Sequence, residues 1–156
     1  MDKTIGYWIE TLSGYISAVI IMYFSFENWE KLEFIKSADF LDKIISITTT
    51  LFGFLLAVLT LIIQSNSSTI TKMKSHGSFK RLILLNKLTV LTSIINCIYS
   101  LILAFTIKLI EIKSLTLLKI ATTINIGIFS FVIVNTFLFT IIFYKIILED
   151  EKDDSH

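Results

Sequence analysis

Four long apolar stretches constrain this chain more than any other feature of its sequence. They cover residues 5–24, 44–63, 88–107 and 120–144. Each is close to the roughly 20 helical residues needed to cross the hydrocarbon core of a bilayer. They are too long for tilted membrane strands and do not alternate strictly between apolar and polar residues, although β-branched side chains are frequent. The pattern predicts four transmembrane α-helices.

The composition also favours lipid as the surrounding medium. Hydrophobic residues make up 54% of the 156 residues and charged residues 17%, against about 45–50% and about 25% in average soluble chains. The core of so small a chain cannot absorb that excess, which excludes an ordinary soluble enzyme or a disordered protein. No proline is present to kink a helix. We expect a single membrane domain over residues 1–148, with residues 149–156 as a solvated acidic tail.

The segment between the first two stretches, residues 25–43, combines five acids with three lysines. Its apolar residues recur at every third position: Phe26, Trp29, Leu32 and Ile35. Tryptophan favours the headgroup level of a membrane. The segment is therefore predicted to form a short amphipathic helix along the membrane surface.

The linker at residues 64–87 holds five basic residues and no acid. By the positive-inside rule it lies in the cytoplasm, which places both termini there too. His76, Gly77 and Ser78 indicate a turn, with Gly77 past one helix end and Ser78 capping the next helix. The second helix would then continue to about Ser75 and the third would begin near Phe79, forming a basic cytoplasmic hairpin.

Two interpretations of the basic hairpin remain open. One is ordinary positive-inside topology with attraction to anionic headgroups. The other is a docking site for an acidic cytosolic protein or a phosphate-bearing ligand. The docking residues would be Lys72, Lys74, His76, Lys80 and Arg81.

Each apolar stretch also carries small and polar residues along one face of a helix with 100° per residue. In the second stretch these are Ser46, Thr49, Thr50, Gly53, Ala57, Thr60 and Gln64. In the third they are Thr89, Ser93, Asn96 and Ser100, and in the fourth Thr122, Asn125, Thr136, Thr140 and Tyr144. In the first they are Gly6, Glu10, Ser13, Gly14 and Ser17. We expect every one of these faces to turn away from lipid.

These polar faces allow two interpretations. Small residues let membrane helices approach closely, and hydroxyl and amide groups hydrogen-bond across the contact. Gly53-x-x-x-Ala57 and Gly14-x-x-x-Ala18 have the required spacing. Alternatively, one face, such as that of the second stretch, lines a water-filled path that an apolar constriction such as Leu56 gates by dewetting. Four helices are too few for a wide channel, so a pore would require a homo-oligomer.

Glu10 is an acid within the first apolar stretch. Intramembrane acids are costly and often functional. Glu10 would contact a cation, a proton or a neighbouring subunit, or else reach the interface from a position near the helix end.

Several classes of chemistry lack the residues they need. Cys97 is the one cysteine and is interpreted as a small buried hydrophobe, so neither a disulfide nor a paired metal site is expected. No Gly-rich phosphate loop, metal-spaced His/Cys cluster or Ser/His/Asp set occurs in the sequence. The net charge of +1 argues against nucleic-acid binding. We expect no enzyme activity, no metal and no cofactor.

In its four-span layout and its basic segment from Thr71 to Arg81, the chain resembles the small membrane subunits of bacterial anti-phage defence systems. Examples are the membrane subunit of the Kiwa system and the accessory membrane proteins of some CRISPR systems. The resemblance implies an oligomer in a bacterial inner membrane that responds to, or acts for, a soluble partner. We therefore expect an all-α, homo-oligomeric four-helix bundle that perturbs or perforates the membrane. The alternative is a non-conducting anchor or sensor that recruits a cytosolic partner through the basic hairpin.

Overall fold

The described part of the chain is helical and contains no strand. The structure, a computed structural model, describes residues 3–64, 77–109 and 115–153, with side chains over 12–64, 79, 81–108 and 115–144. Its four long helices are α1 (Lys3–Glu27), α2 (Ala38–Gln64), α4 (Gly77–Leu109) and α5 (Leu115–Asp153), and a short 3-10 helix, η1 (Glu33–Lys36), precedes α2. The all-α prediction is confirmed.

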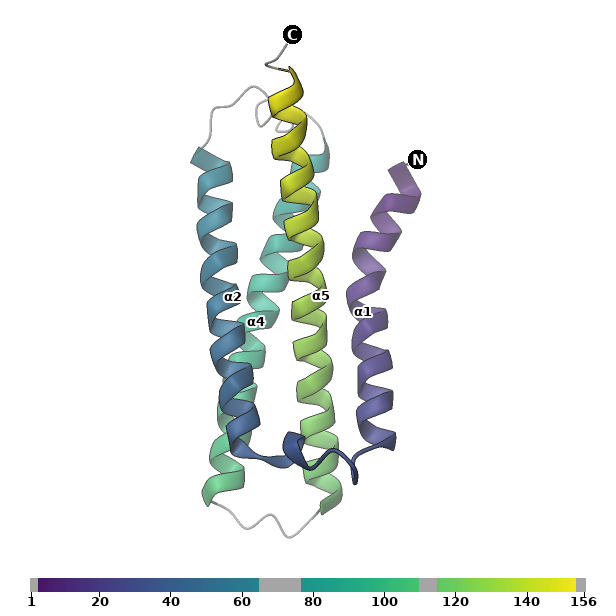
Figure 1. Ribbon diagram of the computed structural model, residues 1–156, viewed down its shortest axis with the longest axis vertical. Coiled ribbons are helices and arrows are strands. Elements are labelled where there is room, and N and C mark those ends of the chain that lie inside the picture. Colours follow the sequence, from purple (N-terminus) through teal and green to yellow (C-terminus); the bar gives the residue numbers. More distant parts are fainter. Residues whose placement is uncertain (1–2, 65–76, 110–114, 154–156) are drawn as a thin grey trace.

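The helices lie side by side with alternating directions (Figure 1). α4 packs against α2 on one side and α5 on the other, and α1 packs along the remaining side of α5. The start of α1, the end of α2, the start of α4 and the end of α5 all lie at the upper end of Figure 1. The end of α1, the start of α2, the end of α4 and the start of α5 lie at the opposite end, as four antiparallel helices require.

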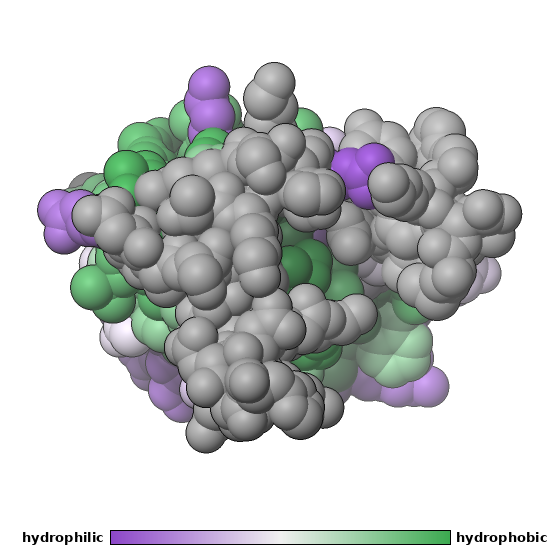
Figure 2. Space-filling view, turned by 90° about the horizontal axis from the view of Figure 1, so that it is seen from above, coloured by the Kyte–Doolittle hydropathy of each residue, from purple (hydrophilic) through white to green (hydrophobic). Residues whose placement is uncertain are grey.

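Three helices are long and apolar enough to cross a membrane: Ala38–Gln64, Arg81–Lys108 and Leu115–Tyr144. In α1, the apolar part with described side chains is shorter, Leu12–Glu27. Large hydrophobic side chains on the outside of α4 and α5 are more than half exposed, among them Ile98, Ile102, Phe105, Phe137 and Ile141. Seen from the upper end, hydrophobic residues cover much of the described surface (Figure 2). Such a surface fits lipid rather than water.

Two apolar clusters hold α2, α4 and α5 together near the two ends of the bundle. The upper cluster consists of Leu55, Val58, Ile62, Leu82 and Phe139. The lower cluster consists of Leu41, Ile44, Leu103 and Ala104. The buried residues of α2 follow alternating steps of three and four, the spacing of one helix face that meets a neighbour.

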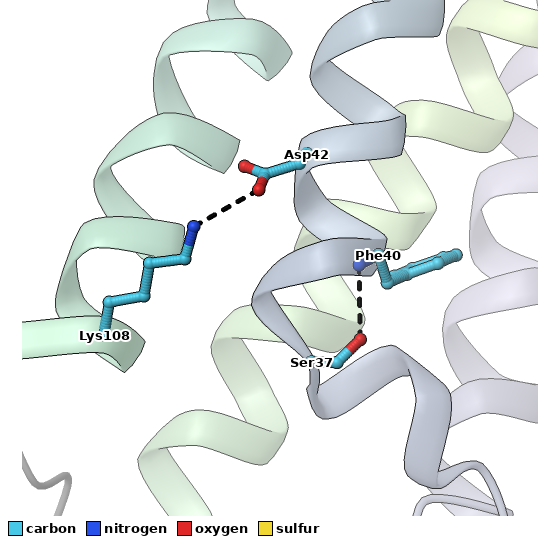
Figure 3. A network of polar contacts seen from close by, with 4 residues as sticks. All are labelled: Ser37, Phe40, Asp42 and Lys108. Atoms are coloured by element: carbon cyan, nitrogen blue, oxygen red, sulfur yellow. Dashed lines mark hydrogen bonds and ion pairs between the residues drawn. The ribbon is translucent and has the colours of Figure 1, made fainter.

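The segment predicted as one amphipathic surface helix, residues 25–43, is built differently, so that prediction is wrong. α1 continues to Glu27, a turn and η1 follow, and α2 already begins at Ala38. The Ser37 hydroxyl accepts a hydrogen bond from the Phe40 backbone N–H at 3.2 Å, which caps α2 (Figure 3). Trp29 and Ile35 are each only 2% exposed, because both turn into the bundle instead of lying along one outer face.

Helix boundaries differ from the predicted ones at two other places. α4 begins at Gly77, so Gly77 opens this helix and Ser78 lies inside it, where the sequence had suggested a turn and a cap. α5 extends beyond the predicted span to Asp153, so part of the acidic tail continues the helix. The predicted tip of the basic hairpin, residues 65–76, lies outside the described residues.

Candidate functional site

The small and polar stripe on α2 faces outward from the single chain. We use the name α2 stripe for Ser46, Thr49, Thr50, Gly53, Ala57, Thr60 and Gln64, each of which is exposed. The face of α2 that packs inside the subunit is instead mainly apolar: Leu41, Ile44, Thr48, Leu55, Val58 and Ile62. The prediction that this stripe is turned inward is therefore wrong for one chain, because α2 uses its aliphatic face to contact α4.

The α2 stripe leaves room for a second helix at its centre. A Cβ atom built on Gly53 would have no neighbouring atom within 4 Å. The hydroxyls of Thr49, Thr50 and Thr60 donate to backbone carbonyls one turn earlier, at 2.8, 2.9 and 2.9 Å. Their oxygen lone pairs still allow them to accept from another group. Gly53-x-x-x-Ala57 thus makes no close helix contact within the chain.

A row of buried polar residues runs along the inner side of α4, as predicted from the third apolar stretch. We call it the inner polar ladder, and its members, all 0% exposed, are Asn86, Thr89, Ser93, Asn96 and Ser100. The Asn86 side chain donates to the backbone carbonyl of Leu55 in α2 at 3.0 Å. Asn125 of α5 donates from Nδ2 to the Ser100 hydroxyl at 2.7 Å. The ladder therefore ties α4 to both of its neighbours.

Some buried polar atoms in this interior have no hydrogen-bond partner in the structure. They are Thr48 Oγ1, Asn86 Oδ1, Asn125 Oδ1 and both side-chain amide atoms of Asn96. A buried donor or acceptor left unpaired costs about 1–3 kcal/mol. Asn96 stands out in the ladder, because neither polar atom of its buried side chain has a hydrogen-bond partner within the single chain.

The polar face of α1 packs against α5, so the prediction for Gly14-x-x-x-Ala18 is confirmed. A Cβ on Gly14 would lie 2.6 Å from Asn135 Oδ1, and one on Gly127 would overlap the side chain of Met22. The Ser130 hydroxyl lies 3.5 Å from that of Ser17. Glycine on each helix thus permits the close approach that membrane helices use in place of a hydrophobic driving force.

Sequence reasoning missed Asn86 and Asn135, both of which are buried. Asn86 continues the three-and-four spacing of the ladder but lies just outside the predicted span, 88–107. Asn135 belongs to a second buried face of α5, which meets α1. Assigning a single polar face to each helix overlooks a helix that is buried on two sides.

At the lower end of the bundle, charged side chains join the helices near their termini. Lys108 Nζ of α4 lies 3.3 Å from Asp42 Oδ2 of α2 (Figure 3). Lys119 of α5 lies over the ring of Phe26 at 3.9 Å from its centroid. These contacts place the end of α4 beside the start of α2, and the start of α5 beside the end of α1, and suit side chains at a membrane boundary.

The pair between Asp42 and Lys108 is expected to contribute little to stability, because both side chains are more than half exposed. Asp42→Asn should change the free energy of unfolding by less than about 1 kcal/mol. Denaturation in detergent, combined with Lys108→Gln in a double-mutant cycle, measures the coupling. A much larger coupling energy would mean that the pair is shielded from solvent in the assembled protein.

For most of the remaining predicted site residues, the structure does not describe the side chain. Lys72, Lys74 and His76 fall outside the described residues, and the Glu10 and Lys80 side chains do so as well. Arg81 is described and exposed near the start of α4. Within the described ranges, no group of three or more His, Cys, Asp or Glu residues is placed to hold a metal.

Comparison of the chain with protein-family models, curated proteins and solved structures finds no match.

Proposed function

We propose that this protein is a homo-oligomeric integral membrane protein whose subunits meet through the α2 stripe and whose assembly perforates or perturbs a bilayer. The observation that carries the proposal is the exposure of the whole stripe on one chain. From Ser46 to Gln64 it spans about 27 Å of helix, close to the thickness of the hydrocarbon core. Lipid gains nothing from such a surface, whereas a second helix can approach it closely.

The proposal includes α1 as a fourth crossing. Its 25 residues extend about 37 Å, enough to span the core beside α5. The basic linker at residues 64–87 then favours cytoplasmic termini in a bacterial inner membrane. The resemblance to anti-phage membrane subunits supports an effector that acts for a cytosolic partner, with the basic hairpin as the docking element.

Because Gly53 lies at the centre of the proposed helix contact, water in the assembly would reach the edge of the α2 stripe that carries Thr49 and Thr60, and this predicts a labelling pattern. In a Cys97→Ala background, Thr49→Cys and Thr60→Cys should react with a membrane-impermeant thiol reagent in liposomes that leak, and faster than Gly53→Cys. Ile47→Cys is the control, because Ile47 is 45% exposed and lies about 120° around the helix from Gly53. Modification of Ile47→Cys at the same rate, or of neither threonine position, would show that the stripe does not line a path.

Dye or ion release from liposomes distinguishes the two functional interpretations. Release that rises with the fraction of assembled protein supports a perforating effector. Intact liposomes together with co-purification of a cytosolic protein would contradict perforation and favour the anchor. Charge reversal at Lys72, Lys74, Lys80 and Arg81 should then abolish that co-purification.

A further inference from the structure

The inner polar ladder runs from Asn86, which donates to the carbonyl of Leu55 in the upper apolar cluster, down to Ser100. The Thr49 hydroxyl lies 3.6 Å from Cys97 Sγ, which places Thr48 level with Asn96. Ser100 lies one turn along α4 from Asn96 and accepts from Asn125 of α5. Thr48, Asn96, Ser100 and Asn125 thus form one central polar layer. The upper and lower apolar clusters lie on either side of it.

The unpaired atoms of this layer indicate which kind of ligand could form hydrogen bonds with them. Thr48 Oγ1, Asn125 Oδ1 and Asn96 Oδ1 are acceptors, and Asn96 Nδ2 is a donor. A cation would satisfy the oxygens but oppose the amide N–H groups. An anion would do the reverse, and none of the four side chains carries a charge to balance either ion. The complementary ligand is a small neutral molecule that both donates and accepts.

We propose that the central polar layer binds water between α2, α4 and α5. A buried water needs two to four polar partners, and unpaired buried groups are where such waters occur in proteins. The layer offers four unpaired atoms from three helices, so bound water bridges α2 to α4 and α5. The lower apolar cluster lies below this layer, and above it the ladder continues through Ser93 and Thr89 to Asn86.

This inference concerns the interior of one subunit and does not depend on the proposed oligomer. Bridging water also gives the ladder a structural role, because it fixes the register of three helices that lack a hydrophobic driving force in lipid. Asn96 is the main contact, since both of its side-chain polar atoms are unpaired and the residue is fully buried.

Water-edited NMR on the full chain in lipid nanodiscs tests the inference. Magnetisation should pass from water to the Asn96 side-chain amide protons, as it should to those of Asn28, which lies just after α1. The backbone amide of Ile98, on the lipid-facing side of α4, is the negative reference. Absence of transfer to Asn96 would overturn the inference, and this readout on the unmodified chain does not depend on any variant folding.

Two variants sharpen the test. Asn96→Leu should lower the unfolding temperature, because it removes a water ligand and leaves its partners unpaired, whereas Ile95→Leu on the exposed side should not. A higher unfolding temperature for Asn96→Leu would indicate a dry layer and contradict the inference. The signal should also persist in Gly53→Leu, in which the leucine side chain occupies the open centre of the α2 stripe and is expected to keep subunits apart. Its loss there would mean that the water comes from between subunits.

Discussion

Gly53→Leu is expected to convert the assembled protein into monomers and to lower the rate of dye release from liposomes by at least about tenfold. The leucine side chain would occupy the space that a second helix needs at the centre of the α2 stripe. A loss of only about 1.4 kcal/mol in association free energy already weakens assembly tenfold. Native mass spectrometry in detergent measures the subunit number, and dye release measures perforation.

The fold of the single subunit should survive this change. A Cβ at position 53 meets no atom of its own chain within 4 Å, and leucine favours a helix by close to 1 kcal/mol relative to glycine. Ile47→Phe, which adds volume on an exposed part of α2 outside the stripe, is the matched control and should keep both assembly and release. If the Gly53→Leu protein assembles and leaks like the parent, the subunits do not meet through the α2 stripe.

Gly127→Val is expected to have the opposite pattern, with the damage inside the subunit. A Cβ at this position already overlaps Met22 and lies 3.4 Å from the Ala18 carbonyl oxygen, so valine forces α1 away from α5. Overpacking of this kind costs about 1–3 kcal/mol. The unfolding temperature in detergent should fall.

A disulfide formed between Ser17→Cys and Ser130→Cys reports the separation directly, because the two hydroxyls are 3.5 Å apart. In a Cys97→Ala background its yield should drop when Gly127→Val is added. Met22→Ala removes the obstructing side chain and should restore part of the yield. An unchanged yield without Met22→Ala would show that α1 does not pack on α5 through Gly127.

The two glycine positions show how far sequence patterns reach. Gly14-x-x-x-Ala18 and Gly53-x-x-x-Ala57 have the same spacing, yet the first packs against α5 and the second is open to the outside. Spacing shows that a helix can be approached closely, but not whether the approaching helix belongs to the same chain. The position of neighbouring helices decides that, and it depends on contacts far apart in the sequence.

The sequence by itself determined the four long helices and the inner polar ladder of α4 from Thr89 to Ser100. Both follow from local periodicity and hydropathy, because the backbone N–H and C=O groups of a segment in the membrane must hydrogen-bond to one another within that segment, as they do in a helix. Tertiary structure alone decided that α2 packs through its aliphatic face and that α5 is buried on two sides. It also decided that α2 begins directly after Ser37, earlier in the chain than predicted. In water a helix turns its polar face outward to be hydrated, but lipid offers no such hydration. The rotation of each helix about its own axis is therefore set by how well its faces fit the neighbouring helices.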